Sequence, residues 1–351
     1  MNSKEEKILS FDSSGLSTTD SLFGLPFTTE ESEIIVIPVP WEVTVSYTAG
    51  TSNGPQAILK ASAQVDLYDP YVKDAWKKGI AMIDFPQEIK DKSDRLRKKA
   101  SAHIEALSDG SLKETNSTSI AFTKEIDQAS IELNNWVKNI SLEYLNKNKL
   151  LVLLGGDHST PLGLMQAIAE KYNSFGILQI DAHADLRVAY EGFKYSHASI
   201  IYNALEINQV EKIVQVGIRD FSESEAKMIQ DSKGRINTFF DRDIKQMQFE
   251  GQSWKLICGS IIEKLPQNVY LTFDIDGLDP KLCPNTGTPV AGGFEFEQIL
   301  YLLEQLVESG RKIIAFDLNE VTPGVNEWDA NVGARLLFRI ANMMAKSMEK
   351  S

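Results

Sequence analysis

The sequence predicts a single α/β domain over residues 33–351, a three-layer α/β/α sandwich around a mainly parallel central sheet. From residue 150 onward, short apolar runs alternate with polar or Gly-rich loops and helical segments. This pattern implies parallel strands with helices on both faces of the sheet. Runs such as 176–180 and 312–316 are almost continuously apolar, as expected for strands buried on both faces. The chain has 351 residues and 42% hydrophobic residues, enough to form a large core.

The elements are expected in a simple order along the chain. Residues 1–32 are rich in Ser, Thr, Glu and Lys. We expect them to form an N-terminal arm that packs on the domain, or on a neighbouring subunit with help from its apolar patch at 22–27. Pro55 suits the first turn of a helix that ends near residue 63. A helix at 92–107, which contains His103, is expected on the surface. The other expected strands are 34–37, 150–154, 176–180, 212–217, 269–273 and 312–318, and the other expected helices are 123–147, 161–172, 197–206, 222–231, 253–264, 295–309 and 332–348.

Charge and cysteine content restrict the class of protein. The net charge of −13 disfavours a nucleic-acid partner and mildly favours a cationic small-molecule substrate. Two cysteines, Cys258 and Cys283, cannot form a disulfide framework, which is typical of a reducing compartment. No apolar stretch approaches the ~18 residues of a membrane span, and the first residues lack the apolar core of a signal peptide. We therefore expect a cytoplasmic protein with no membrane partner.

Metal-ligand side chains follow three of the predicted strands. Because successive side chains of an extended chain point to opposite sides, the three ligand-type residues of Asp181-Ala182-His183-Ala184-Asp185 share one side. In open α/β sheets, ligands collect at the carboxyl ends of strands. One Asp at a strand end can be merely a turn former, but four packed together repel one another without cations. The sequence therefore predicts metal-assisted hydrolysis with two divalent ions, Mn²⁺ first and Ni²⁺ or Co²⁺ as alternatives. The candidate ligands are His158, Asp181, His183, Asp185, Asp274 and Asp276.

Three segments carry a resemblance to a known family. Gly155-Gly156-Asp157-His158-Ser159, Asp181-Ala182-His183-Ala184-Asp185 and Phe273-Asp274-Ile275-Asp276-Gly277-Leu278-Asp279-Pro280 resemble the signatures of the ureohydrolases, the family of arginases, agmatinases, guanidinobutyrases and formiminoglutamases. The resemblance implies an arginase-like fold, a trimer or hexamer, and a metal-activated water that attacks a guanidinium carbon and releases urea and an amine. Asp157 is expected either to orient a histidine ligand or to cap its own loop.

The resemblance also implies roles for residues around the ions. Asp185 would be a catalytic carboxylate as well as a ligand. Glu320, after the strand at 312–318, would hold the guanidinium, whose N–H donors match a carboxylate. His197 falls where arginases and agmatinases carry a histidine that moves a proton to the leaving amine. Arg187 stands where arginases typically have Asn, so arginine is not the favoured substrate. Arg187 would pair either with a substrate carboxylate, as in formiminoglutamases, or with a structural acid.

The first choice of function is an agmatinase-like enzyme that converts agmatine to putrescine and urea. Hydrolysis of guanidinobutyrate, free guanidine or formiminoglutamate stays open as an alternative. Two readings of another class are a single-zinc relative of histone deacetylases and a non-catalytic scaffold. The number of ions bound would distinguish the zinc enzyme, because one ion does not need six ligands.

Overall fold

Within the part of the chain that the structure describes, eight strands form one sheet, and every pair of neighbouring strands is parallel. The computed structural model describes residues 3–15, 17 and 21–349. The strand order is β2-β1-β3-β8-β7-β4-β5-β6. The strands are β1 (Ile34–Val39), β2 (Ile80–Met82), β3 (Leu150–Gly155), β4 (Phe175–Ile180), β5 (Val210–Val216), β6 (Ile236–Phe239), β7 (Asn268–Asp274) and β8 (Lys312–Asn319).

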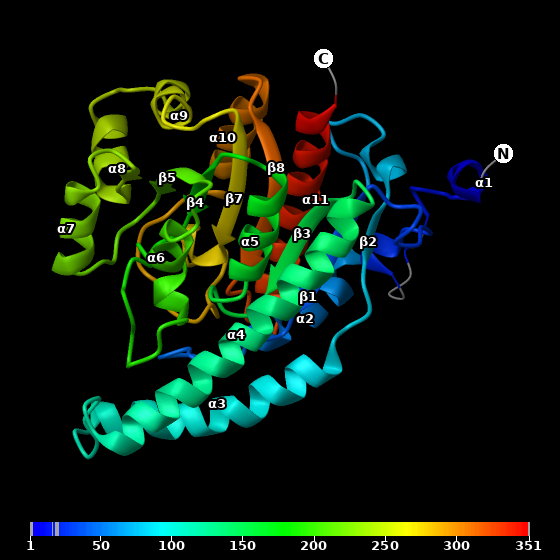
Figure 1. Ribbon diagram of the computed structural model, residues 1–351. Coiled ribbons are helices and arrows are strands. Elements are labelled where there is room, and N and C mark those ends of the chain that lie inside the picture. The colour runs from blue at the N-terminus through cyan, green and yellow to red at the C-terminus, as the bar shows by residue number, and fades with distance from the viewer. Residues whose placement is uncertain (1–2, 16, 18–20, 350–351) are drawn as a thin grey trace.

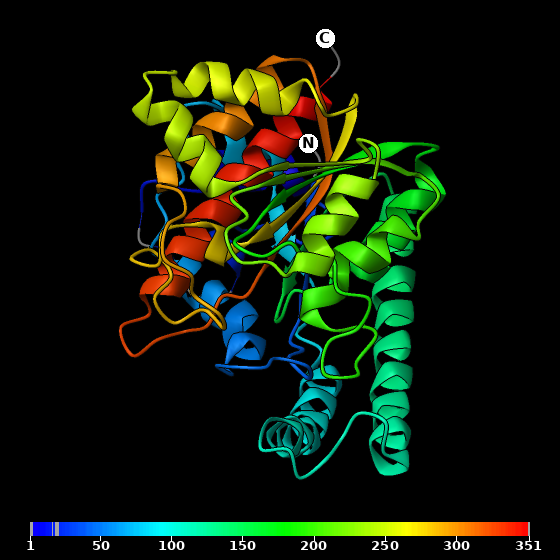
Figure 2. The same ribbon diagram turned by 90° about the vertical axis from the view of Figure 1, so that its left-hand side faces the viewer.

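Helices cover both faces of this sheet, so the predicted three-layer α/β/α sandwich is confirmed (Figures 1 and 2). Alternate strand residues face opposite layers: Val152 and Leu154 pack into one core, and Leu151 and Leu153 into the other. The first core lies under α2 (Gly54–Ser62), α9 (Trp254–Ile262), α10 (Phe296–Glu308) and α11 (Trp328–Met348). The second lies under α3 (Gln87–Ser108), α4 (Ser117–Asn146), α5 (Leu162–Lys171) and α6 (Ile200–Leu205). The remaining α-helices are α1 (Ser3–Ser10), α7 (Glu223–Asp231) and α8 (Asp241–Phe249).

The sheet order separates strands that are consecutive in the chain. β3 and β4 are consecutive, yet β8 and β7 lie between them in the sheet. The carboxyl ends of β3, β8, β7 and β4 are therefore four adjacent positions on one edge. Ligand sites of open α/β sheets form at such a reversal of strand order.

Some elements differ from the sequence prediction. Strand β2 has three residues and β6 has four, of which three are only partly buried. Both strands are too short to show a distinctive pattern, and neither was predicted. Helix α3 begins earlier than expected, and its His103 is not on the surface. The ring is buried between Phe122 and Phe193, with ring centroids 4.9 and 5.5 Å away. In Figure 1 the hairpin of α3 and α4 extends beyond the rest of the fold.

The apolar patch of the N-terminal segment packs on its own domain. Leu22, Phe23, Leu25 and Phe27 are buried, and the Phe23 ring lies 5.1 Å from that of Phe338 in α11. These four side chains are therefore not available for the subunit contact expected from the sequence. Residues 1–2, 16 and 18–20 of the predicted arm lie outside the described residues. Among the described helices, none is long and apolar enough to cross a membrane.

Candidate metal centre

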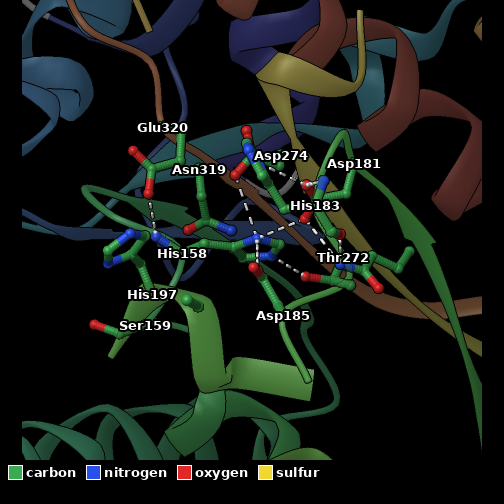
Figure 3. Close-up of polar contacts among 12 residues, drawn as sticks. His158, Ser159, Asp181, His183, Asp185, His197, Thr272, Asp274, Asn319 and Glu320 are labelled. Atoms are coloured by element: carbon green, nitrogen blue, oxygen red, sulfur yellow. Dashed lines mark hydrogen bonds and ion pairs between the residues drawn. The ribbon is translucent and has the colours of Figure 1, made fainter. Parts of the chain in front are cut away.

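His158, in the loop that follows β3, is the centre of a buried cluster of acids (Figure 3). Its Nδ1 lies 3.0 Å from Asp181 Oδ2, 3.1 Å from Asp185 Oδ2 and 3.3 Å from Asp274 Oδ2. Its other ring nitrogen, Nε2, lies 2.8 Å from the Thr272 hydroxyl of β7. One edge of the ring therefore faces three carboxylates, and the other faces a neutral hydroxyl.

Asp181, directly after β4, faces both candidate histidines. Its Oδ2 lies 3.0 Å from His158 Nδ1, and its Oδ1 lies 3.7 Å from His183 Nδ1. Two groups have ligand atoms that all lie within 4.8 Å of one another: His158 with Asp181 and Asp185, and His183 with Asp181 and Asp276. Asp181 belongs to both groups, so its geometry is that of a carboxylate able to bridge two ions.

The other acids each keep at least one oxygen for the cluster. Asp274 Oδ1 accepts the Asp276 N–H at 2.9 Å, which leaves Oδ2 toward His158. Asp276 Oδ1 accepts the Ala182 N–H at 3.0 Å, and Oδ2 lies 3.0 Å from His183 Nδ1. Asp185 has a φ of 53°, a left-handed conformation that is uncommon for a residue with a side chain. All six sequence-predicted ligands therefore meet at one edge of the sheet.

The donor set fits divalent cations. Within the described residues, the buried His158 Nδ1 and Asp276 Oδ2 have no hydrogen-bond partner, although buried polar atoms are normally paired. Burial and the neighbouring Asp181 raise the pKa of Asp185 to about 7. Burial together with Asp276 and Asp181 raises the pKa of Asp274 well above its usual range. Cations bound between these oxygens would reduce the repulsion among the carboxylates and would give the unpaired His158 and Asp276 atoms a partner.

Glu320 lies just beyond β8 and next to this cluster. Its Oε1 accepts the backbone N–H of His158 at 2.9 Å, and its own N–H donates to the Gly156 carbonyl at 2.8 Å. The side chain is 5% exposed, and the residue has a φ of 62°. Burial and the nearby Asp157 raise the pKa of Glu320 well above its usual range, an effect that a cationic partner beside the carboxylate would oppose. A guanidinium would supply one.

His197 and two of the metal-ligand candidates line one cavity of the protein. The cavity has a volume of about 270 Å³, and its lining includes His183, Asp185 and His197. Burial lowers the pKa of His197 to about 3, so the ring is a neutral imidazole at pH 7. Its Nδ1 is buried and, as far as the described chain extends, unpaired. Figure 3 places His197 on the same side of the cluster as Glu320.

Arg187 lies on the wall of the same cavity and pairs with an acid of its own chain. Its Nε lies 3.7 Å from Glu225 Oε2, and its guanidinium lies 5.0 Å from the Tyr190 ring centroid. Glu225 also accepts the Leu186 N–H at 3.1 Å and caps α7. The sequence left open whether Arg187 pairs with a substrate carboxylate or with an acid of the protein, and in the structure Glu225 is such an acid.

The polar residues under the cluster were not predicted from the sequence. Gln179 donates to Asp181 Oδ2 at 2.8 Å and is itself held by Gln215 at 2.7 Å. Asp317 accepts the hydroxyl protons of Thr272 at 2.8 Å and Tyr270 at 2.6 Å. Polar residues inside fully buried strands were the signal that could have revealed them. Asp157 does not orient His158, because its Oδ1 accepts the Ser159 N–H at 2.9 Å and so caps the loop.

Arg219, after β5, joins the cluster to the cavity wall. One guanidinium nitrogen donates to the carbonyls of Asp276 at 2.6 Å and Val290 at 2.9 Å. Val290 lines the cavity, and Asp276 is a candidate ligand. The fold and the site together thus define a parallel α/β protein with two candidate cation-binding groups at the carboxyl edge of its sheet, next to the buried Glu320 carboxylate.

Comparison with known proteins identifies the family. The Arginase family profile matches residues 32–343, and the chain belongs to this family. The N(1)-aminopropylagmatine ureohydrolase of Thermus thermophilus is 31% identical over 294 residues, 84% of each chain. The agmatinase of Bacillus subtilis is 27% identical over 312 residues, 88% of this chain and 90% of the relative. The agmatine ureohydrolase structure of Thermoplasma volcanium has a TM-score of 0.70 at 21% identity and covers 97% of this chain and 98% of that one, which confirms the fold.

Membership also decides between the predicted classes. The arginase family implies a binuclear divalent metal centre, and the two ligand groups that share Asp181 are consistent with it. The single-zinc and scaffold alternatives are therefore set aside, and the chain is a hydrolase of this family.

Proposed function

We propose that this protein is an agmatinase-type ureohydrolase that cleaves the guanidino group of a small cationic molecule into urea and an amine. The observation that carries the proposal is the junction of two ligand groups at Asp181, beside the buried Glu320 and next to a cavity that His183 and Asp185 line. His158, Asp181, Asp185 and Asp274 would hold one ion, and Asp181, His183, Asp185, Asp274 and Asp276 the other. When bound, such a pair of ions supplies an activated water near neutral pH. Mn²⁺ is the proposed metal, because oxygen-rich ligand sets without thiols suit it.

The chain's own side chains would adapt this centre to a guanidinium. Glu320 holds the planar N–H donors and keeps the guanidinium carbon beside the ligand cluster. His197 Nδ1, unpaired among the described residues and neutral at pH 7, accepts a proton and passes it to the departing amine. Asp185 acts as both ligand and catalytic acid–base group.

The cavity wall favours a substrate whose far end is cationic. Asp220 and Glu225 are two carboxylates on this wall, and Arg187 is a cation already engaged by Glu225. The remaining negative charge attracts the ammonium of agmatine and disfavours the carboxylate of guanidinobutyrate. N(1)-aminopropylagmatine is a second candidate, because a relative that is 31% identical carries that name and Asp220 is exposed enough to meet a further amine.

Urea release tests the proposal directly. The purified protein, supplied with Mn²⁺ or Ni²⁺, is assayed with agmatine, N(1)-aminopropylagmatine, guanidinobutyrate, arginine, guanidine and formiminoglutamate. We expect urea from agmatine or its aminopropyl derivative at the highest kcat/KM. If guanidinobutyrate were the best substrate, the inference that Glu225 engages Arg187 and leaves the cavity wall negative would be refuted. If no guanidino compound released urea, the proposed function would be refuted.

Two further proposals accompany the function. A trimer or hexamer is proposed from the family resemblance, and light scattering after size-exclusion chromatography measures it. A cytoplasmic location is proposed because Cys258 and Cys283 are both buried and free.

A further inference from the structure

We propose that Thr272 and Asp317 are positioning residues that keep the ring proton of His158 on Nε2 and so leave Nδ1 bare toward the candidate ion. The inference rests on the proposed function, since it takes His158 as a metal ligand. Neither residue touches the cavity, and neither belongs to the predicted ligand set.

The two hydrogen bonds of the Thr272 hydroxyl determine which ring nitrogen of His158 carries the proton. A threonine hydroxyl has one proton, and here Thr272 donates it to Asp317 Oδ1 at 2.8 Å. The hydroxyl oxygen can then only accept in its contact with His158 Nε2, also at 2.8 Å. Nε2 must therefore carry the proton. The neutral ring that ligates an ion has one N–H, so with the proton on Nε2 its lone pair is on Nδ1, the atom that faces the candidate ligands Asp181 and Asp185.

The contacts of Asp317 favour its deprotonated, hydrogen-bond-accepting form. It is fully buried, and its carboxylate accepts from Tyr270, Thr272 and the Asn319 amide. Because three donors point at the Asp317 carboxylate, it acts as an acceptor in all of these contacts and donates no proton to Thr272. The hydrogen bond to Asp317 therefore fixes the direction in which the Thr272 hydroxyl donates its proton.

The same end of β8 also fixes the backbone that carries His158. Asn319 Oδ1 accepts the Thr160 hydroxyl at 2.9 Å, and Glu320 Oε1 accepts the His158 N–H at 2.9 Å. Ring and main chain of this histidine are thus both held by contacts from neighbouring strands. A ring that loses the Thr272 acceptor would gain by moving its proton to Nδ1, where three carboxylates accept it. A proton at Nδ1 occupies the lone pair that an ion needs.

Two substitutions separate the hydroxyl from the shape of the side chain. Thr272→Val removes the hydroxyl at nearly constant volume, and Thr272→Ser keeps it. Thr322→Val is a matched control, because Thr322 is also buried and its hydroxyl has no partner within the described residues. We expect Thr272→Val to weaken Mn²⁺ binding by about 10- to 100-fold in calorimetric titration, the usual effect of losing a group that orients a ligand. Thr272→Ser and Thr322→Val should bind as the wild type does.

Histidine tautomers give a readout that a purely structural role would not change. The chain has four histidines, so long-range ¹H–¹⁵N spectra of the ¹⁵N-histidine-labelled, Zn²⁺-loaded protein are simple to assign. We expect the His158 proton on Nε2 in the wild type and in Thr272→Ser. A proton on Nδ1 in the wild type would overturn the inference without any variant, and so would unchanged Mn²⁺ affinity in Thr272→Val. A wild-type protein that binds no ion would instead refute the proposed metal centre itself.

Discussion

Replacement of Glu320 by Gln tests how this site recognises a guanidinium. The amide keeps the shape of the side chain, and its oxygen can still accept the His158 N–H, which lies 2.9 Å from Oε1. The substitution removes the negative charge, and the side chain is only 5% exposed, so water cannot replace the lost partner. Breaking a buried ion pair costs about 3–5 kcal/mol. At about 1.4 kcal/mol for each tenfold change, kcat/KM for agmatine should fall between roughly 100-fold and a few thousand-fold.

The assay compares three quantities in the wild type and in Glu320→Gln: urea release, bound metal per chain and the thermal unfolding midpoint. We expect only urea release to change, because Glu320 is outside the two ligand groups. Glu327→Gln is the matched control, since Glu327 is exposed and pairs with Lys60 on the surface. A Glu320→Gln enzyme within threefold of the wild type would refute the assigned role, and loss of bound metal would show that Glu320 acts on the metal centre instead.

Three other predictions concern the metals, the loop of His158 and the cavity wall. Dialysis against EDTA should lower the midpoint in calorimetry, because the buried carboxylates then repel one another; an ion at 100 times its Kd should restore about 2.7 kcal/mol per site, and an unchanged midpoint would contradict this. Gly155→Ala should destabilise the protein by about 1–3 kcal/mol in urea unfolding, since its Cβ would lie 1.9 Å from Asn319 Oδ1. The control Gly259→Ala, with nothing within 4 Å, should stabilise its helix by about 0.5–1 kcal/mol, and equal effects at both sites would count against the packing argument. Arg219→Lys should raise KM by roughly tenfold, because one or two hydrogen bonds of about 1 kcal/mol each to the Asp276 and Val290 carbonyls are lost; an unchanged KM would argue against a link between Arg219 and the cavity.

Much of the fold was predictable because its signals are local. A buried parallel strand is a continuous apolar run, and β3, β4, β7 and β8 were all found in this way. Strands β2 and β6 were missed because three or four residues do not form a distinctive pattern. His103 was misplaced because the charged face of α3 gave no sign that Phe193, from a distant loop, covers the ring.

The sequence by itself identified the candidate ligand side chains. Ligand residues that directly follow a strand reach the carboxyl edge of the sheet whatever the order of the strands, so the six candidates could be named from local spacing. Only the tertiary structure decided which of them meet. It showed that β8 and β7 lie between β3 and β4, that Asp181 faces both histidines, and that Arg187 pairs with Glu225. Most of these contacts join residues from different strands and loops that are far apart in the chain, and no local pattern of residues encodes such distances.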